Sequence, residues 1–178
     1  MEHLFVIDNF LTEPEADEIY HEVLRWEPEL MNLGPHDYDG VKGDALTGRY
    51  KYYNGLNNPL IGKILIPKFL TLFGMGRFYQ CWFNAFRKGD RIEPHMHNTQ
   101  DNNHKLNHFQ CTNLFIGGDS AEGTYYGKEL YPNKKGTLFV FHDSLVHWTE
   151  PYTGDDVRIT MACDIHPIRK NPLMKQLK

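Results

Sequence analysis

The sequence predicts an α+β fold that is mainly β, with a β-sandwich or jelly-roll core and N-terminal supporting helices. The chain has 178 residues, which suits one domain, and 40% of them are hydrophobic, enough for a core. Helical spacing of apolar residues is confined to 1–77, whereas short aromatic and β-branched runs recur from 78 onward. We therefore expect a single domain, 1–178, with an N-terminal part at 1–77, a β core at 78–165 and a polar tail at 166–178.

The N-terminal part is expected to begin with a strand and a capped helix. Residues 4–8 form a short apolar, β-branched run that is typical of a strand. Thr12 and Glu15 have the three-residue spacing of a capping box, and Pro14 is placed early in the helix. Apolar residues then recur at three- and four-residue spacing as far as Trp26, which predicts an amphipathic helix.

A lid-like loop and a second helix complete the N-terminal part. Residues 32–58 are rich in glycine and polar residues, which predicts a long loop without regular structure that could determine substrate selectivity. Apolar residues on one face predict a helix over 59–72, and Gly74 and Gly76 end it.

The β core is expected to contain six short strands bounded by turn-forming residues. We predict these strands at 78–86, 109–116, 123–126, 137–141, 146–150 and 157–164. The tail from residue 169 is polar, and we expect it to fray.

Charge and cysteine content exclude several function classes. A net charge of −4 argues against a general nucleic-acid binder and against a polybasic membrane-surface protein. No run approaches the ~18 apolar residues of a membrane span, and residues 1–3 do not resemble the start of a secretory signal. Cys81, Cys111 and Cys163 are scattered and suggest no disulfide framework. We therefore expect a reduced, cytoplasmic setting with neither membrane nor nucleic acid as partner.

Ten histidines stand beside only three cysteines, and the positions of three of them indicate a metal site. His95 and His97 are two residues apart, so on an extended strand both side chains point to the same face. His147 follows another predicted strand fifty residues after His97, and Arg158 lies eleven residues beyond it. Three separated imidazoles without cysteine describe an open octahedral face, which suits iron(II) better than structural zinc.

With these motifs, residues 78–165 resemble the double-stranded β-helix (jelly roll) core of the iron(II)/2-oxoglutarate-dependent dioxygenases, and the small bacterial and phage prolyl-hydroxylase-like members most. The opening residues 5–12 and the helix after them also resemble the start of these enzymes. The resemblance implies that His95 and His147 bind iron and that Arg158 binds the distal carboxylate of 2-oxoglutarate. Thr160, on the same strand face as Arg158, would assist that carboxylate.

The second ligand position departs from the family pattern. The family has a carboxylate there, whereas this chain has His97, which we expect to be a true ligand. Asp101, in the polar loop that follows, is the alternative source of the carboxylate. Three neutral imidazoles would leave the iron more positively charged than two imidazoles and a carboxylate.

Further positions are expected to line the cosubstrate or substrate pocket. The resemblance points to Tyr79, Trp82 and Asn84 on the strand before the two close histidines. Asn113 is a polar residue in an apolar run and is a candidate contact of the cosubstrate. We expect His142 to have a structural or rim role and His104 and His108 to lie on the surface.

The activity implied by the resemblance needs Fe(II), 2-oxoglutarate and O2. It hydroxylates a C–H bond of an amino-acid, peptide or small-molecule substrate while 2-oxoglutarate is oxidatively decarboxylated to succinate. A cupin-type dioxygenase that uses three histidines without 2-oxoglutarate is the alternative, because Gly89 and the His-x-His pair match the first cupin motif. Against it, the glutamate that the cupin motif has a few residues after that pair is absent, and Arg158 would have no task. A non-enzymatic jelly-roll binding module is a third reading.

Overall fold

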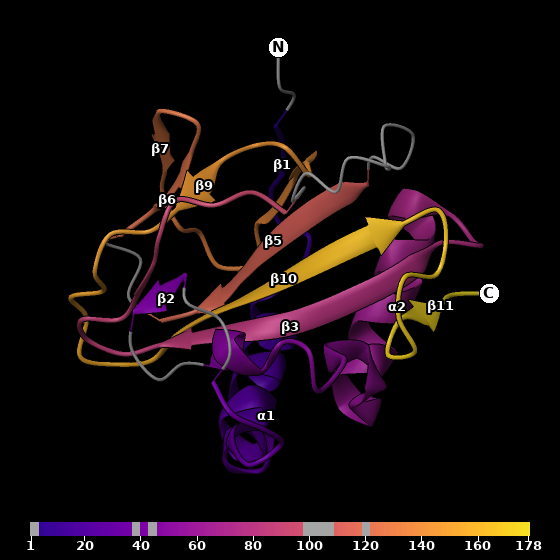
Figure 1. The fold of residues 1–178 in the computed structure, drawn as a ribbon, viewed down its shortest axis with the longest axis horizontal. Coiled ribbons are helices and arrows are strands. Elements are labelled where there is room, and N and C mark those ends of the chain that lie inside the picture. Colours follow the sequence, from indigo (N-terminus) through magenta and orange to yellow (C-terminus); the bar gives the residue numbers. More distant parts are fainter. Residues whose placement is uncertain (1–3, 37–39, 43–45, 98–108, 119–121) are drawn as a thin grey trace.

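The chain folds around a six-stranded antiparallel sheet with the order β1-β8-β5-β10-β3-β11 (Figure 1). The computed structural model describes residues 4–36, 40–42, 46–97, 109–118 and 122–178. Two small sheets, β2-β4 and β7-β6-β9, accompany the large one. The strands are β1 (Phe5–Ile7), β2 (Val41–Lys42), β3 (Phe78–Phe86), β4 (Arg91–Ile92), β5 (Gln110–Gly117), β6 (Thr124–Tyr126), β7 (Glu129–Tyr131), β8 (Leu138–His142), β9 (His147–Trp148), β10 (Arg158–His166) and β11 (Lys175–Gln176).

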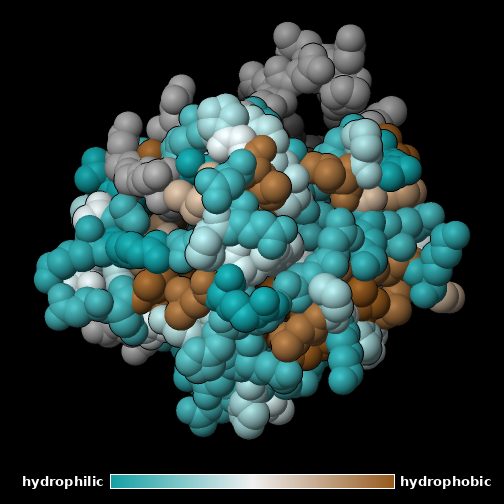
Figure 2. All heavy atoms as spheres, turned by 90° about the horizontal axis from the view of Figure 1, so that it is seen from below, coloured by the Kyte–Doolittle hydropathy of each residue, from teal (hydrophilic) through white to brown (hydrophobic). Residues whose placement is uncertain are grey.

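Two helices, α1 (Glu13–Met31) and α2 (Pro59–Phe73), cover one face of the large sheet (Figure 1). The predicted capping box is present: the Glu15 amide donates to Thr12 Oγ1, and the Thr12 amide donates to Glu15 Oε2 at 2.8 Å. The Asn58 side chain caps α2, and Gly74 ends it with a φ of 76°, which favours glycine. The outer surface seen in Figure 2 is mostly hydrophilic with scattered hydrophobic residues. Among the helices that the structure describes, none combines the length and apolar character of a membrane span.

The two faces of the large sheet have different roles. Side chains alternate along a strand, so one set of positions packs on the helices and the other faces the small sheets. On β3, for example, Cys81, Phe83 and Ala85 are buried in the main hydrophobic cluster, whereas Asn84 and Trp82, which also contacts that cluster, line a cavity on the opposite face. This alternation decides which predicted residues reach the site.

The segment 32–58 is largely packed against the sheet, so the expectation of a long structureless loop was wrong for the residues described. It contains β2 and two short 3-10 helices, η1 (Leu46–Arg49) and η2 (Gly55–Asn57). Leu46 and Leu56 are buried in the helix-side core. Asn54 Nδ2 donates to Tyr79 O at 2.8 Å, which fixes the segment to β3. Glycine and polar content suggested a loop, but these long-range contacts outweigh it.

The C-terminal tail does not fray. β11 pairs with β3, and Met174 and Leu177 are buried. The tail is mostly polar, so its composition did not indicate that Met174 and Leu177 would be buried.

Cys81 and Cys163 form a disulfide, so the expectation of unpaired cysteines was also wrong. They lie directly opposite each other on β3 and β10, on the helix side of the sheet. Strand pairing brings together residues that are 82 positions apart, which spacing in the sequence cannot show. Cysteine usage therefore gives no argument for a reduced setting.

Candidate metal centre and cavity

Three histidines converge between the large sheet and the small sheets. His95 and His147 face each other in an antiparallel bridge: the His95 amide donates to His147 O at 3.1 Å, and the His147 amide donates to His95 O at 2.9 Å. The His97 amide donates to Asp143 O at 2.9 Å, in the turn that leads to β9. One possible ligand atom from each of the three histidines lies within 4.8 Å of the others. The predicted metal ligands are therefore brought together.

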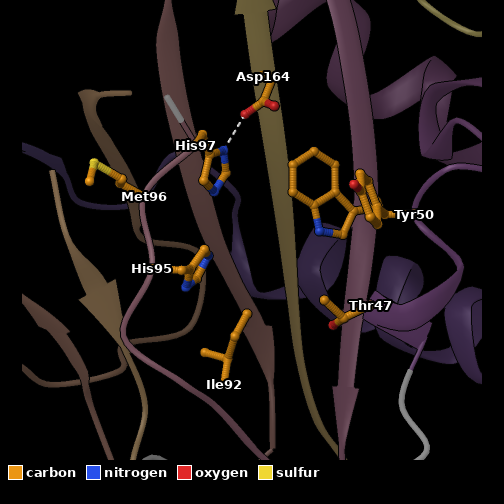
Figure 3. Close-up of a pocket in the computed structure, with 8 residues that line it drawn as sticks. Thr47, Tyr50, Ile92, His95, Met96, His97 and Asp164 are labelled. Atoms are coloured by element: carbon orange, nitrogen blue, oxygen red, sulfur yellow. Dashed lines mark hydrogen bonds and ion pairs between the residues drawn. The ribbon is translucent and has the colours of Figure 1, made fainter. Parts of the chain in front are cut away.

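Hydrogen bonds orient all three rings in the same way. The Nδ1 atoms of His95 and His147 lie 3.0 Å from the carbonyl oxygens of Glu93 and Leu145. The Nδ1 atom of His97 lies 2.5 Å from Asp164 Oδ1 (Figure 3). Oxygens of these kinds only accept, so each Nδ1 carries the hydrogen and each Nε2 carries the lone pair that a metal needs.

The electrostatics of His95 and His147 agree with metal binding. Burial, aided by the neighbouring His97, lowers the pKa of His95 to about 4. Burial also holds the pKa of His147 well below its usual range. Both rings are thus neutral at pH 7, the form that binds a metal ion. Burial acts in the same direction on His97, but the Asp164 carboxylate outweighs it and raises the pKa of this ring.

Arg158 begins β10 and is 2% exposed. Its Nη2 donates to Thr124 Oγ1 at 3.0 Å and to Asn133 Oδ1 at 3.4 Å, both neutral groups. Its Nε is buried without a hydrogen-bond partner, and in the described part of the chain Arg158 forms no ion pair with a carboxylate. Burial lowers the pKa of the guanidinium to about 10, so it stays charged at pH 7. A buried cation of this kind suits an anionic ligand.

One cavity, which we call the inner cavity, connects the histidines to Arg158. Its walls include His95, His97, His147, Arg158, Thr160, Asn113, Asn84, Trp82 and Thr124. Thr160 Oγ1 accepts from Asn84 Nδ2 at 2.9 Å, so the hydroxyl hydrogen of Thr160 remains available to a ligand oxygen. The amide of Asn113 donates to the Tyr126 hydroxyl at 3.1 Å, while Asn113 Oδ1 is buried without a partner. Buried polar atoms without partners indicate a place for a polar ligand.

Tyr79 is the predicted site residue that the structure places elsewhere. It is fully buried on the helix side of β3, where its ring stacks on Phe69 of α2 at 5.7 Å. Tyr79 and Trp82 are an odd number of positions apart on one strand and so face opposite sides of the sheet. The prediction that Tyr79 contacts the cosubstrate is therefore wrong, whereas Trp82 and Asn84 do line the cavity.

Asp101, His104 and His108 lie outside the described residues. His142 is not part of the cavity wall, and its Nδ1 lies 2.8 Å from Ser144 Oγ in the turn after β8.

Sequence reasoning missed Asp164, Thr124 and Asn133. Asp164 is an even number of positions from Arg158 and Thr160 on one strand, a signal that was available in the sequence. Thr124 lies in the small β7-β6-β9 sheet and Asn133 follows β7, so both reach Arg158 of the large sheet only through tertiary packing, for which the sequence holds no local signal.

A second cavity, the outer cavity, opens over His95 and His97 (Figure 3). Its other walls are Thr47, Tyr50, Trp82, Ile92, Met96 and Asp164. The Tyr50 and Trp82 rings are 5.6 Å apart, so this side of the site is bounded mainly by aromatic and apolar surface.

Comparison with solved structures identifies the fold. A prolyl-4-hydroxylase from Pseudomonas putida has 13% identity and a TM-score of 0.60, with 95% of each chain covered. A viral collagen prolyl hydroxylase from Paramecium bursaria chlorella virus 1, solved with 2-oxoglutarate, has 16% identity and a TM-score of 0.64, with 93% of this chain and 96% of that chain covered. The chain has the fold of the Fe/2-oxoglutarate-dependent oxygenases.

A third solved structure has the same fold at lower sequence identity. HygX from Streptomyces hygroscopicus, solved with nickel and 2-oxoglutarate, has 9% identity and a TM-score of 0.66, with 93% of this chain and 83% of that chain covered. No protein-family model and no curated protein sequence matches the chain. The fold likeness agrees with the family that the histidine and arginine motifs suggested.

Proposed function

We propose that the protein is an Fe(II)/2-oxoglutarate-dependent dioxygenase that hydroxylates a C–H bond of an amino-acid, peptide or small-molecule substrate and converts 2-oxoglutarate to succinate. The observation that carries this proposal is the buried Arg158 in the wall of a cavity that is also lined by three histidines placed so that they could bind one metal ion. We also interpret the large sheet and the β7-β6-β9 sheet as the two halves of a double-stranded β-helix within one domain, 1–178.

The three histidines fit an iron(II) ion. Their Nε2 atoms would occupy one face of an octahedron and leave three positions for a chelating cosubstrate and oxygen. When bound, iron(II) supplies the oxygen chemistry that protein side chains lack. The carbonyl groups of Glu93 and Leu145 fix the rings of His95 and His147 beforehand, so binding needs little reorganisation.

Arg158, Thr160 and Asn113 fit the 2-oxoglutarate end of the cavity. The guanidinium offers a charged, forked donor to the distal carboxylate, and its Nε has no other partner. Thr160 can donate its hydroxyl hydrogen to the same carboxylate. Burial of this end excludes water and strengthens the charge interaction.

The outer cavity is the place for the substrate. Tyr50, Trp82 and Met96 would shield the target C–H bond from water and hold it beside His95 and His97. Structures of the same fold contain a hypoxia-inducible-factor peptide in a Trichoplax adhaerens prolyl hydroxylase and hygromycin B in HygX. Peptides and small molecules are therefore both proposed as substrate classes. The cytoplasmic location is a separate prediction from the sequence.

The test is turnover of 2-oxoglutarate to succinate by the purified protein with Fe(II) and oxygen. We expect slow turnover even without substrate and its loss in Arg158→Ala. Arg169→Ala is the matched control, because this arginine is exposed and contacts only carbonyl oxygens of the tail. Absence of both turnover and 2-oxoglutarate binding in the parent protein would refute the proposal. A metal affinity that changes neither on addition of 2-oxoglutarate nor in Arg158→Ala would instead favour the cupin alternative.

A further inference from the structure

Asp164 lies against His97 on the side of the ring away from the other two histidines' ligand atoms. Its Oδ1 is 2.5 Å from Nδ1 of His97 (Figure 3). The two nitrogens of an imidazole point in different directions, so a carboxylate that bonds to Nδ1 cannot bind a metal held by Nε2 of the same ring. Asp164 is therefore not a replacement for the carboxylate that is missing at position 97.

We propose that Asp164 is the positioning residue that holds His97 in its metal-binding orientation and supplies negative charge to a ligand set made only of neutral imidazoles. The inference rests on the proposed function, because it concerns the same metal centre. Asp164 acts through His97 and does not touch the metal or the substrate's reacting atoms.

The sheet holds Asp164 firmly in this place. On central strand β10 it lies opposite Cys111 of β5 and Gln80 of β3. The thiol of Cys111 donates to the same oxygen, Asp164 Oδ1, at 3.3 Å. Burial holds the pKa of Cys111 well above its usual range, so the thiol keeps the hydrogen that it donates. The acceptor for His97 is thus fixed by backbone pairing and by a second donor.

His97 differs from the other two ligands in the partner that orients it. His95 and His147 donate to neutral carbonyl oxygens, whereas His97 donates to a carboxylate. A charged acceptor makes the hydrogen bond stronger and the imidazole a more basic ligand. The His97 side chain is 8% exposed and the Asp164 side chain is 18% exposed, so water screens the charge of the carboxylate only weakly. The carboxylate therefore reduces the excess positive charge that a +2 ion would bring to this centre.

A second group of side chains near His97 could also bind a metal ion, and an experiment has to distinguish the two sites. Possible ligand atoms of His97, Cys111 and Asp164 also lie within 4.8 Å of one another. A metal bound there would use Nδ1 of His97 together with a thiolate, and Asp164 would then be a ligand itself. Sulfur ligation gives Co(II) an intense charge-transfer absorption that imidazole ligation lacks.

The experiment titrates Co(II) into the metal-free full-length protein and measures Kd by calorimetry and the absorption spectrum of the bound ion. Asp164→Asn keeps an oxygen that can accept from His97 but removes the charge, and Asp164→Ala removes both. Asp155→Asn is the matched control, because Asp155 is 94% exposed and pairs only with Lys88. Thermal unfolding and near-ultraviolet circular dichroism show that each variant is folded.

We expect Kd for Co(II) to rise about 10- to 100-fold in Asp164→Asn and further in Asp164→Ala, which should also alter the Co(II) spectrum. The control should bind like the parent protein. If the folded Asp164 variants bind Co(II) with unchanged Kd and spectrum, the inference is wrong while the proposed function stands. A sulfur-to-cobalt band in the parent protein also overturns it. Failure of the parent protein to bind any Co(II) contradicts the proposed function itself, and the inference with it.

Discussion

Replacing Arg158 by methionine should separate ligand binding from stability. Methionine has a similar length but no charge, so Arg158→Met removes the donors that we assign to the distal carboxylate of 2-oxoglutarate. Each hydrogen bond to a charged group contributes about 1.5–3 kcal/mol, so two bonds from the guanidinium amount to about 3–6 kcal/mol. At about 1.4 kcal/mol for each factor of ten, Kd for 2-oxoglutarate should rise about 10²- to 10⁴-fold.

The same substitution should change stability little. Thr124 and Asn133 each lose a donor, which destabilises the fold, while removal of a buried cation that has no carboxylate partner in the described structure has the opposite effect. We expect the free energy of unfolding to change by no more than about 1 kcal/mol.

The assay is calorimetric titration of 2-oxoglutarate into protein loaded with Mn(II), which replaces iron and prevents turnover. Thermal unfolding is measured with and without 2-oxoglutarate, because a ligand that binds the folded state raises Tm. Arg169→Met serves as the control. Unchanged affinity in Arg158→Met would refute the reasoning, as would a loss of affinity that merely follows general unfolding.

Three further predictions concern the ligands, a helix cap and the tail. His147→Ala should abolish high-affinity metal binding and His142→Ala should not, as measured by Co(II) calorimetry; equal losses would contradict the ligand assignment. Glu22 accepts hydrogen bonds from Arg25 and, at 2.6 Å, from Asn58 Nδ2. The bond from Arg25 has the larger effect, and together the two bonds lower the pKa of Glu22 from its usual 4.5, although burial acts in the opposite direction. That stabilisation, about 1 kcal/mol, is present above pH 4.5 and is lost as pH falls through the lowered pKa, so urea denaturation of Glu22→Gln and of the parent protein should converge at acid pH. Leu177→Ala should cost about 2 kcal/mol, measured by urea denaturation, whereas a frayed tail would show no cost.

Local patterns in the sequence predicted the elements well because they depend on near neighbours. The capping box at Thr12 and the glycine after α2 are interactions within a few residues, and both are confirmed. The structure brings His95, His97, His147 and Arg158 to one cavity, and their roles there stay a prediction that rests on motif spacing and on the family resemblance. Stricter use of strand periodicity would have excluded Tyr79 and included Asp164.

What the sequence could not show depends on strands that are distant along the chain. Strand register brings Cys81 and Cys163 together. Tertiary packing brings Thr124 and Asn133 within hydrogen-bond distance of Arg158 and buries Leu177 in the helix-side core. The segment 32–58 was mistaken for a loop for the same reason, since its buried residues pack against partners far away in sequence.

We propose that one cavity holds a metal at the three histidines and 2-oxoglutarate between that metal and Arg158. Anaerobic addition of Fe(II) and then 2-oxoglutarate tests it most directly, because a 2-oxo acid that chelates iron(II) produces a visible metal-to-ligand charge-transfer absorption. We expect this absorption in the parent protein, its loss in His147→Ala, and a need for much more 2-oxoglutarate in Arg158→Met. Bound Fe(II) that gives no such absorption at saturating 2-oxoglutarate would contradict this arrangement of metal and cosubstrate.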